Sequence, residues 1–294
     1  MRRGIVALVA VAILASAATV AWWRVSAGGS SHAADAICGT QAGAQPRTYR
    51  HVVWIVLENK TYDDVVGAEN APFLNGLATK CGLATNYFAV AHPSLPNYIA
   101  MTSGSTAGIA DDKLPSAHPL EGPSLFSQLG EDWHALLESM PAPCRLTDEG
   151  LYAARHNPAA YYVDLRDACK RQESAGPLDP TARFTLVVPN LCHDGHNCPV
   201  ATVDRWLAHA VRPLLQSSTY LDGGTAVFVV WDEADEGGPN RVPAIVISPY
   251  TPAATRADAT FDHYSLLKTT ESMLGLPCLA AACRSPSMRS AFGL

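Results

Sequence analysis

The chain has 294 residues, of which 48% are hydrophobic, and its formal net charge is −6 at pH 7. This acidic balance argues against nucleic-acid binding, because no basic stripe with interleaved aromatic residues is present to neutralise a phosphate backbone. A phosphate-bearing ligand would need a metal cation or a local cluster of donors to offset the negative field of the protein.

The first 36 residues have the pattern of an export signal. Two arginines follow Met1, residues 4–23 are uninterruptedly small or apolar, and Ala34-Asp-Ala36 offers a cleavage site. We expect residues 1–36 to be a signal peptide or, if uncleaved, an N-terminal membrane anchor, because residues 4–23 are long enough to span a bilayer. The protein is therefore predicted to be secreted or held in the cell envelope, and residues 37–294 form a single predicted domain.

All eight cysteines lie beyond the predicted cleavage site. An even number of cysteines in an oxidising compartment predicts disulfides, and the absence of a Cys-x-x-Cys motif argues against zinc-ribbon and thioredoxin folds. The sequence alone leaves many pairings open. Proximity along the chain favours Cys192–Cys198, Cys278–Cys283 and Cys144–Cys169, and elimination then leaves Cys38–Cys81.

Three apolar runs end abruptly at polar residues. Their β-branched and aromatic residues, without polar alternation, predict strands that are buried on both faces, and hence an α/β fold with a largely parallel sheet between two layers of helices. The strands and the polar residues that follow them are residues 51–57 before Glu58 and Asn59, residues 184–188 before Asn190, His193 and His196, and residues 226–231 before Asp232 and Glu233. Since ligands bind at the carboxyl ends of such strands, we expect these residues to converge.

The remaining elements follow from periodicity and from Gly and Pro positions. We expect residues 105–123, rich in Gly, Pro, Ser and Asp, to form a long surface loop that acts as a lid or contacts the substrate. The other predicted elements are helices over residues 72–80 with Gly82 as cap, from Ser94 onward, over 124–140, over 203–215 and from Asp262 to Gly275, strands at 86–91 and 244–247, and a polar turn at 172–180.

Glu58, Asn59, Asp232 and Glu233 are candidate ligands of one divalent metal ion. Carboxylate and amide oxygens suit a hard cation, and four acids occur within residues 232–236, where their mutual repulsion favours a bound cation. The alternatives are that Glu58 and Asn59 cap a turn and that the acids form a solvated turn.

Ser94 is the candidate nucleophile. At the start of a helix, a phosphoryl group beside Ser94 would be stabilised by backbone N–H donors, and a neighbouring metal would lower the pKa of the hydroxyl. Asn97, one turn later, would donate to a phosphate oxygen. The alternative is an ordinary helix-capping serine. No Gly-x-Ser-x-Gly motif is present, which argues against an α/β-hydrolase esterase.

Three histidines are candidates for the same site. His193 and His196 follow a strand end near a predicted disulfide and would act as metal ligands or as a general acid for the leaving oxygen, or alternatively as plain loop residues. His263 begins the last helix. His92 and His156 are weaker candidates, whereas His51, His134 and His209 are predicted to be structural.

Five blocks of sequence, in order, resemble the bacterial phosphoesterase family that joins secreted acid phosphatases to phospholipases C. They contain Val-Leu-Glu-Asn-Lys-Thr-Tyr-Asp, His-Pro-Ser-Leu-Pro-Asn-Tyr, Pro-Asn-Leu-Cys-His-Asp-Gly-His, Trp-Asp-Glu-Ala-Asp and Asp-His-Tyr-Ser-Leu-Leu-Lys-Thr-Thr-Glu, all between residues 51 and 277. The chain length and the His-Pro-Ser block are most similar to secreted acid phosphatases of the SapM type.

The resemblance implies an alkaline-phosphatase-like fold and one phosphoesterase domain at residues 37–294. It also implies one divalent metal ion held by Glu58, Asn59, Asp232 and Glu233, and Ser94 as the phosphorylated nucleophile. Glu233 departs from the Asp-Asp pair of some family members, which leaves the identity of the metal open. His193 would be the catalytic acid, and the phosphate-binding residues would be Asn97, His196 and His263.

The sequence therefore predicts an exported, metal-dependent acid phosphatase that hydrolyses phosphate monoesters through a phosphoserine. Its predicted substrates are small phosphorylated compounds, including phospholipid-derived ones, and no nucleic acid is expected to bind. The alternatives are a phospholipase C-type phosphodiesterase, a metal-independent carboxylesterase and a non-catalytic exported binding protein.

Overall fold

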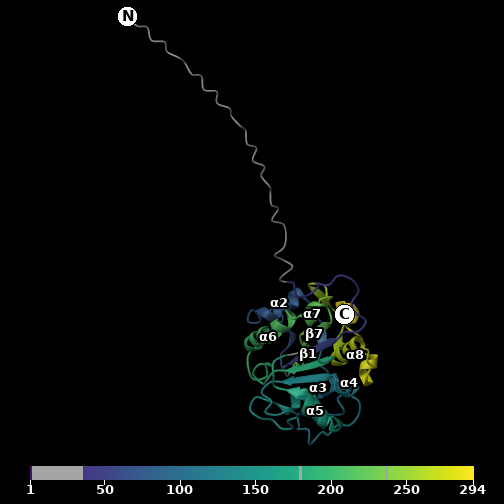
Figure 1. Ribbon diagram of the computed structural model, residues 1–294. Coiled ribbons are helices and arrows are strands. Elements are labelled where there is room, and N and C mark those ends of the chain that lie inside the picture. The colour runs from purple at the N-terminus through teal and green to yellow at the C-terminus, as the bar shows by residue number, and fades with distance from the viewer. Residues whose placement is uncertain (2–35, 179–180, 236–237) are drawn as a thin grey trace. The chain divides into compact units, whose positions relative to one another are not determined.

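The computed structural model describes Met1 and residues 36–178, 181–235 and 238–294 (Figure 1). The predicted signal peptide or anchor, with its apolar residues 4–23, lies outside these ranges apart from its two end residues. Within the described residues, no helix has both the length and the hydrophobicity required of a transmembrane span. The contacts of the residues from 36 onward form one compact unit.

The centre of this unit is a sheet to which eight strands belong within the described ranges, in the order β5-β4-β6-β1-β7-β8-β2-β9. The strands are β1 (His51–Leu57), β2 (Gly82–Ala84), β4 (Trp133–Leu137), β5 (Glu173–Ser174), β6 (Phe184–Val188), β7 (Thr225–Trp231), β8 (Ala244–Ile247) and β9 (Thr255–Ala257). A separate parallel pair joins β3 (Tyr87–Phe88) to β10 (Phe261–Asp262). The predicted strands at 51–57, 184–188, 226–231 and 244–247 are confirmed.

The pairing of the strands is largely parallel, as predicted. β1 lies parallel to both β6 and β7, and β4 lies parallel to β6, so these four strands end at the same edge of the sheet. Only β8, among the strands described here, runs against its neighbours β7 and β2. The four shared carboxyl ends are the place where a parallel sheet presents its binding site.

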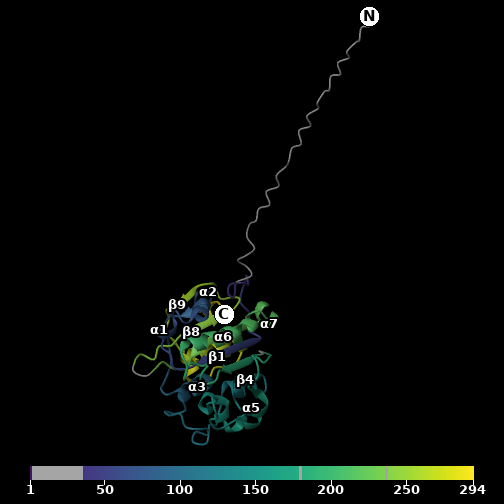
Figure 2. The same ribbon diagram turned by 90° about the vertical axis from the view of Figure 1, so that its left-hand side faces the viewer.

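Helices cover both faces of the sheet, which confirms the three-layer α/β prediction. Helices α2 and α6 pack together on one face, and α3 and α8 pack together on the other (Figures 1 and 2). The α-helices are α1 (Tyr62–Val65), α2 (Pro72–Lys80), α3 (Ser94–Ser103), α4 (Leu125–Leu129), α5 (Arg166–Gln172), α6 (Val200–Leu215), α7 (Ser218–Leu221), α8 (His263–Leu274) and α9 (Arg289–Phe292). Short 3-10 turns are η1 (Ala154–His156), η2 (Pro158–Tyr161), η3 (Val163–Leu165) and η4 (Ala280–Arg284).

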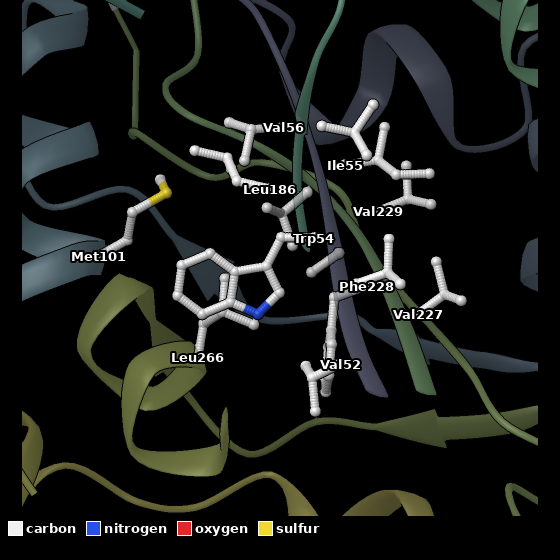
Figure 3. Close-up of a cluster of buried hydrophobic side chains, with 14 of the residues drawn as sticks. Val52, Trp54, Ile55, Val56, Met101, Leu186, Val227, Phe228, Val229 and Leu266 are labelled. Atoms are coloured by element: carbon white, nitrogen blue, oxygen red, sulfur yellow. The ribbon is translucent and has the colours of Figure 1, made fainter. Parts of the chain in front are cut away.

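The two layers meet the sheet through apolar side chains that alternate along β1 (Figure 3). Trp54 lies on the side of Met101 in α3 and Leu266 in α8, whereas Ile55 points to the opposite side. The indole N–H of Trp54 donates to Thr270 Oγ1 in α8 at 2.9 Å, so the polar atom of this fully buried side chain is satisfied. Burial of both faces explains why β1 lacks the polar alternation of a surface strand.

Local signals set the ends of the two helices that matter for the site. Helix α3 begins at Ser94, carries Pro96 in its first turn, where no N–H donor is needed, and ends at Gly104 with a left-handed φ of 76°. Helix α8 begins after Asp262, whose carboxylate accepts from the N–H of Ser265 at 2.8 Å, and ends at Gly275. Both beginnings agree with the sequence prediction.

Three predicted elements were wrong in extent or type. The predicted helix at 124–140 ends at Leu129 and is followed by strand β4, because pairing with β6 outweighs the helix preference of its Ala and Leu residues. Of the predicted strand at 86–91, only Tyr87 and Phe88 pair. Gly82 does not cap α2 but begins β2, where a Cβ would lie 2.5 Å from the Phe292 ring.

All four predicted disulfides are confirmed: Cys38–Cys81, Cys144–Cys169, Cys192–Cys198 and Cys278–Cys283. The third closes the loop that follows β6, and the first ties the start of the described chain to the end of α2. Such crosslinks restrict the unfolded chain and stabilise the fold.

Candidate active site

The carboxyl ends of β1 and β7 bring two acidic residues together. Leu57 and Trp231 are register partners, and the N–H of Asp232 donates to the Leu57 carbonyl at 2.8 Å, so Glu58 and Asp232 leave the sheet side by side. The N–H of Glu58 donates to the carbonyl of Asp194, which ties the loop after β6 to the same place at 2.9 Å. Both Glu58 and Asp232 are fully buried.

The hydroxyl of Ser94 faces Glu58 and Glu233, the residue after Asp232. Ser94 Oγ lies 3.0 Å from Glu58 Oε2 and 3.0 Å from Glu233 Oε1, and only 2% of the residue is exposed. The single hydroxyl proton can be donated to either carboxylate in turn. The structure thus brings Ser94, Glu58, Asp232 and Glu233 together from the ends of β1 and β7 and the start of α3.

The oxygen atoms of this cluster fit a divalent cation. Asn59 Oδ1 and Asp232 Oδ2 are buried without a hydrogen-bond partner, which is costly unless another group, such as a cation, contacts them. Burial raises the pKa of Glu58 well above its usual value, and the charges of Asp232 and Asp194 raise it further. Burial followed by the charge of Glu233 does the same to the pKa of Asp232. An all-oxygen set of this kind suits Mg²⁺, Ca²⁺ or Mn²⁺.

A cavity of about 280 Å³ opens beside Ser94. Its lining includes Asn59, Ser94, Asp112, His196 and Glu233. Asp112 belongs to the segment 105–123, in which the structure contains no helix or strand, as expected. The carboxylate of Asp112 accepts from the N–H of Leu95 at 2.9 Å, so this segment contacts the first turn of α3. The cavity is large enough for a phosphate group and part of its leaving group.

A second buried group lies on the other side of Glu58. The side chains of Glu58, His156 and Asp194 each present one ligand atom, and these atoms lie within 4.8 Å of one another. His156 stacks on the ring of Tyr98 with centroids 5.3 Å apart, and the Tyr98 hydroxyl donates to Glu58 Oε1 at 2.6 Å. His156 was only a weak candidate from the sequence, and Asp194 and Tyr98 were not predicted, although Asp194 stands between His193 and Gly195 in the motif after β6.

Arg155 is a further cation that the sequence analysis missed. It donates to His196 Nε2 at 3.2 Å and lies 3.6 Å from Asp112, and both of these residues line the cavity. Its neighbour His156 stands in a 3-10 turn, where no periodic pattern signals a site. The only sequence signal for Arg155 and His156 is that two basic residues stand together before Asn157 and Pro158.

Asn97 contacts the backbone that precedes Ser94. Its Oδ1 accepts from the N–H groups of Val90 and Ala91, both at 3.0 Å, and its Nδ2 donates to the carbonyls of Ala91 and Pro93. All of its hydrogen-bonding capacity is used within residues 90–93. The geometry therefore supports a role for Asn97 in holding the backbone of residues 90–93, which lead into α3, and not the predicted role of binding phosphate directly.

His263 is buried behind the acidic pair. Its Nε2 donates to the carbonyl of Asp232 at 2.6 Å, so its Nδ1 accepts from the Tyr87 hydroxyl at 3.0 Å. Burial lowers the pKa of His263 to about 4, which keeps the ring neutral at the pH of most compartments. His263 therefore supports the backbone at Asp232 and does not face the cavity beside Ser94.

His193 lies among a different set of residues. Its Nδ1 is 2.9 Å from Glu138 Oε2, and its ring stacks on Trp206. Glu138 and Trp206 line another cavity, of about 400 Å³, between the ends of β4 and β6 and helix α6. The structure thus places His196 at the cavity beside Ser94, but gives His193 no contact there.

Residues 68–277 match the Phosphoesterase family, which is more than half of the chain. The chain belongs to this family. It is 31% identical over 266 residues to a phosphatidylinositol-3-phosphatase of Mycobacterium tuberculosis, covering 87% of this chain and 86% of that protein. The membership confirms the predicted resemblance and the predicted class of enzyme, a phosphoric ester hydrolase.

The chain is also similar to a fungal acid phosphatase and to a solved bacterial structure. The chain is 28% identical to a phosphate-repressible acid phosphatase of Penicillium chrysogenum, with 77% of this chain and 59% of that protein covered, so the chain spans less than two thirds of this fungal relative. A crystal structure of an alkaline phosphatase superfamily protein from Vibrio parahaemolyticus aligns with a TM-score of 0.56 at 13% identity over 87% of this chain and 73% of that one. The second likeness confirms the predicted alkaline-phosphatase-like fold.

Proposed function

We propose that the protein is a metal-dependent acid phosphatase that hydrolyses phosphate monoesters through a phosphoserine at Ser94. The observation that carries the proposal is the position of the Ser94 hydroxyl, 3.0 Å from each of two buried carboxylates, at the mouth of a cavity. A hydroxyl with proton acceptors beside it and an adjacent cavity is the arrangement that nucleophilic catalysis requires.

The proposed cation is held by Glu58, Asn59, Asp232 and Glu233, whose oxygens include the unpartnered Asn59 Oδ1 and Asp232 Oδ2. When bound, a divalent cation supplies positive charge that lowers the pKa of a neighbouring hydroxyl and stabilises the charge of the transferred phosphoryl group. Glu233 also contacts His92 through Oε2, which holds the carboxylate in its present orientation.

The reaction proceeds in two steps. Ser94 Oγ attacks phosphorus, its proton passes to Glu233, and the bond from phosphorus to the ester oxygen breaks as the same proton is passed on to the departing alcohol. Water then attacks the phosphoserine, so that inorganic phosphate is released and the Ser94 hydroxyl is restored. Both attacks occur in line with the leaving oxygen, and the buried position of Ser94 allows approach only from the cavity.

His196 and Arg155 are proposed to bind the phosphate. The guanidinium of Arg155, which donates to His196 Nε2, offers a planar pair of donors that matches two phosphate oxygens, and His196 itself lines the cavity. Asn97 and His263 are proposed to position Ser94 and Asp232. His193 is proposed to act outside the phosphoryl-transfer site, because its contacts belong to another cavity.

The substrate is proposed to be a small phosphorylated compound. The similar mycobacterial protein is named for its action on a phosphatidylinositol 3-phosphate, which makes phospholipid-derived monoesters the first compounds to test. The protein is also proposed to be exported, because four disulfides favour an oxidising compartment. Attachment to a membrane through residues 4–23 is the alternative to release.

The experiment is a phosphate-release assay on p-nitrophenyl phosphate, phosphatidylinositol 3-phosphate and bis(p-nitrophenyl) phosphate, before and after EDTA treatment. We expect release from the monoesters, loss of activity with EDTA and recovery on addition of a divalent cation. Faster cleavage of the diester would instead favour a phospholipase C-type phosphodiesterase, and full activity after EDTA would favour a metal-independent hydrolase. No turnover of any ester would favour a binding protein.

A further inference from the structure

We propose a second cation site formed by Glu58, His156 and Asp194, which shares Glu58 with the Ser94 cluster and takes a borderline metal ion such as Zn²⁺. The site is built from three separate parts of the chain: the end of β1, the turn η1 and the loop after β6. Its three ligand atoms lie within 4.8 Å of one another, so a single ion between them can contact all three with small side-chain movements.

Two of these atoms lack partners. His156 Nε2 and Asp194 Oδ2 are buried and accept or donate no hydrogen bond, although only 2% of His156 and none of Asp194 is exposed. Unpartnered polar atoms at such depth are rare, because desolvation without a new contact costs free energy. A cation between the two atoms would satisfy both at once.

Glu58 is oriented to serve both sites. Its Oε2 faces the Ser94 hydroxyl at 3.0 Å, and its Oε1 lies 3.3 Å from His156 Nε2 on the other side. Carboxylates that present one oxygen to each of two positions bridge paired metal ions in many hydrolytic enzymes.

Surrounding contacts hold the other two ligands in place. Tyr98 stacks on the His156 ring, and the N–H of His196 donates to Asp194 Oδ1 at 2.7 Å, which leaves Asp194 Oδ2 free to face the Nδ1 atom of His156 at 3.6 Å. The Cys192–Cys198 disulfide closes the loop that carries Asp194. Such outer contacts orient metal ligands before the ion binds.

The charges of the region also favour a second cation. Glu58, Asp194, Asp232 and Glu233 are four buried carboxylates, and one divalent cation would match only two of their charges. The nearby guanidinium of Arg155 lies instead next to Asp112 and Asp148.

The ligand chemistry of the two sites differs. The Ser94 site offers oxygen atoms alone, which suit hard cations, whereas the second site adds an imidazole nitrogen, which favours Zn²⁺ and its neighbours. We therefore expect the second site to bind Zn²⁺ more tightly than the Ser94 site, and both sites to fill when Zn²⁺ is in excess. The competing arrangement is a metal-free His156 that lies between the two carboxylates.

The test is a count of bound zinc on the purified full-length protein. The protein is stripped with EDTA, dialysed against Zn²⁺ and analysed by mass spectrometry of the bound metal, with circular dichroism to confirm folding. We expect about two ions per chain for wild type and about one for Asp194→Asn and for His156→Gln. His118→Gln, which changes a histidine paired with Asp111 outside the site, should keep the wild-type number.

The outcomes separate this inference from the proposed function. A wild-type count of one that Asp194→Asn leaves unchanged would overturn the second site, whatever the activity. A count of one that Asp194→Asn abolishes would support the second site and contradict the proposed cation beside Ser94. Two bound ions without any phosphatase activity would retain the site and reject the proposed reaction.

Discussion

Ser94 Oγ and Glu58 Oε2 lie 3.0 Å apart, although 36 residues separate them in the sequence. Glu58 stands at the end of a central strand, and Ser94 begins a helix on the face of the sheet that carries α8. This contact exists because a parallel sheet presents its strand ends at one edge and because residues 90–93 lead the chain back to that edge.

Tyr98→Phe should weaken the site without disturbing the fold. The Tyr98 hydroxyl donates to Glu58 Oε1 at 2.6 Å, and burial raises its pKa, so it remains a donor. Loss of such an outer contact typically lowers activity or metal affinity about 10-fold to 100-fold. Steady-state kinetics and metal titration measure the effect. Tyr220→Phe, which loses a buried hydrogen bond to Ile37, is the control, and an equal fall in both variants would contradict a specific role for Tyr98.

Asn97→Ala should lower stability by about 2–4 kcal/mol, because it leaves buried backbone groups of residues 90–93 without their partners. We also expect a lower kcat, since these residues lead into Ser94. Urea unfolding and kinetics check both. Asn75→Ala removes a similar set of backbone contacts far from Ser94 and should change stability alone. Unchanged stability with a raised KM would instead make Asn97 a phosphate ligand.

His193→Gln should leave phosphate release close to the wild-type rate. The residue contacts Glu138 and Trp206, which line the larger cavity and not the one beside Ser94. The comparison uses p-nitrophenyl phosphate, whose leaving group needs no acid, and glycerol phosphate, whose leaving group does. A loss of about 100-fold or more with glycerol phosphate alone is what a general acid would produce, and it would restore the catalytic role predicted from the sequence.

Glu173 should make the protein more stable in acid than at neutral pH. Burial raises the pKa of this carboxyl from 4.5 to about 7, although the N–H of Cys144 donates to it at 2.7 Å. Below pH 4.5 the group is protonated in both the folded and unfolded states. As the pH rises to 7, ionisation favours the unfolded state, and the contribution of about 3 kcal/mol is lost.

Urea unfolding of wild type and Glu173→Gln between pH 4 and 8 measures this contribution as the difference between the two curves. We expect the difference between the two free energies of unfolding to change by about 3 kcal/mol across the range. The variant should become more stable relative to wild type as the pH rises. Parallel curves would show that Glu173 does not titrate in this range. Cys144 and Cys169 lie beside Glu173 but form a disulfide, so they offer no thiolates that could hold a metal ion together with this carboxylate.

The strand ends could be predicted because buried parallel strands have a distinctive composition. Residues 51–57, 184–188 and 226–231 each lack polar alternation, and the polar residues that follow must lie at the same edge of the sheet. The convergence of Glu58, Asp232 and Glu233 could therefore be predicted from the sequence. Ser94 was found from the helix start and from the family resemblance, and the present geometry brings its hydroxyl to Glu58 and Glu233.

The residues and elements that were not predicted correctly depend on tertiary contacts. His156 and Arg155 lie in a 3-10 turn whose position depends on contacts with α3 and is not signalled by any periodic pattern. Strand β4 was predicted as helix because its Ala and Leu residues favour helices, and only the pairing with β6 decides its state. The sequence could not show which of His193 and His196 faces Ser94. Residues only three positions apart on a loop can face different cavities.

The most direct test of the central claim is chemical trapping of the nucleophile. Wild-type protein that is turning over p-nitrophenyl phosphate is quenched in acid, digested and analysed by mass spectrometry for a phosphorylated peptide, with folded Ser94→Ala as the control. The account predicts one phosphoryl group on Ser94 and no turnover by Ser94→Ala. Turnover by that variant at the wild-type rate, with no phosphate on Ser94 in the wild type, would contradict it.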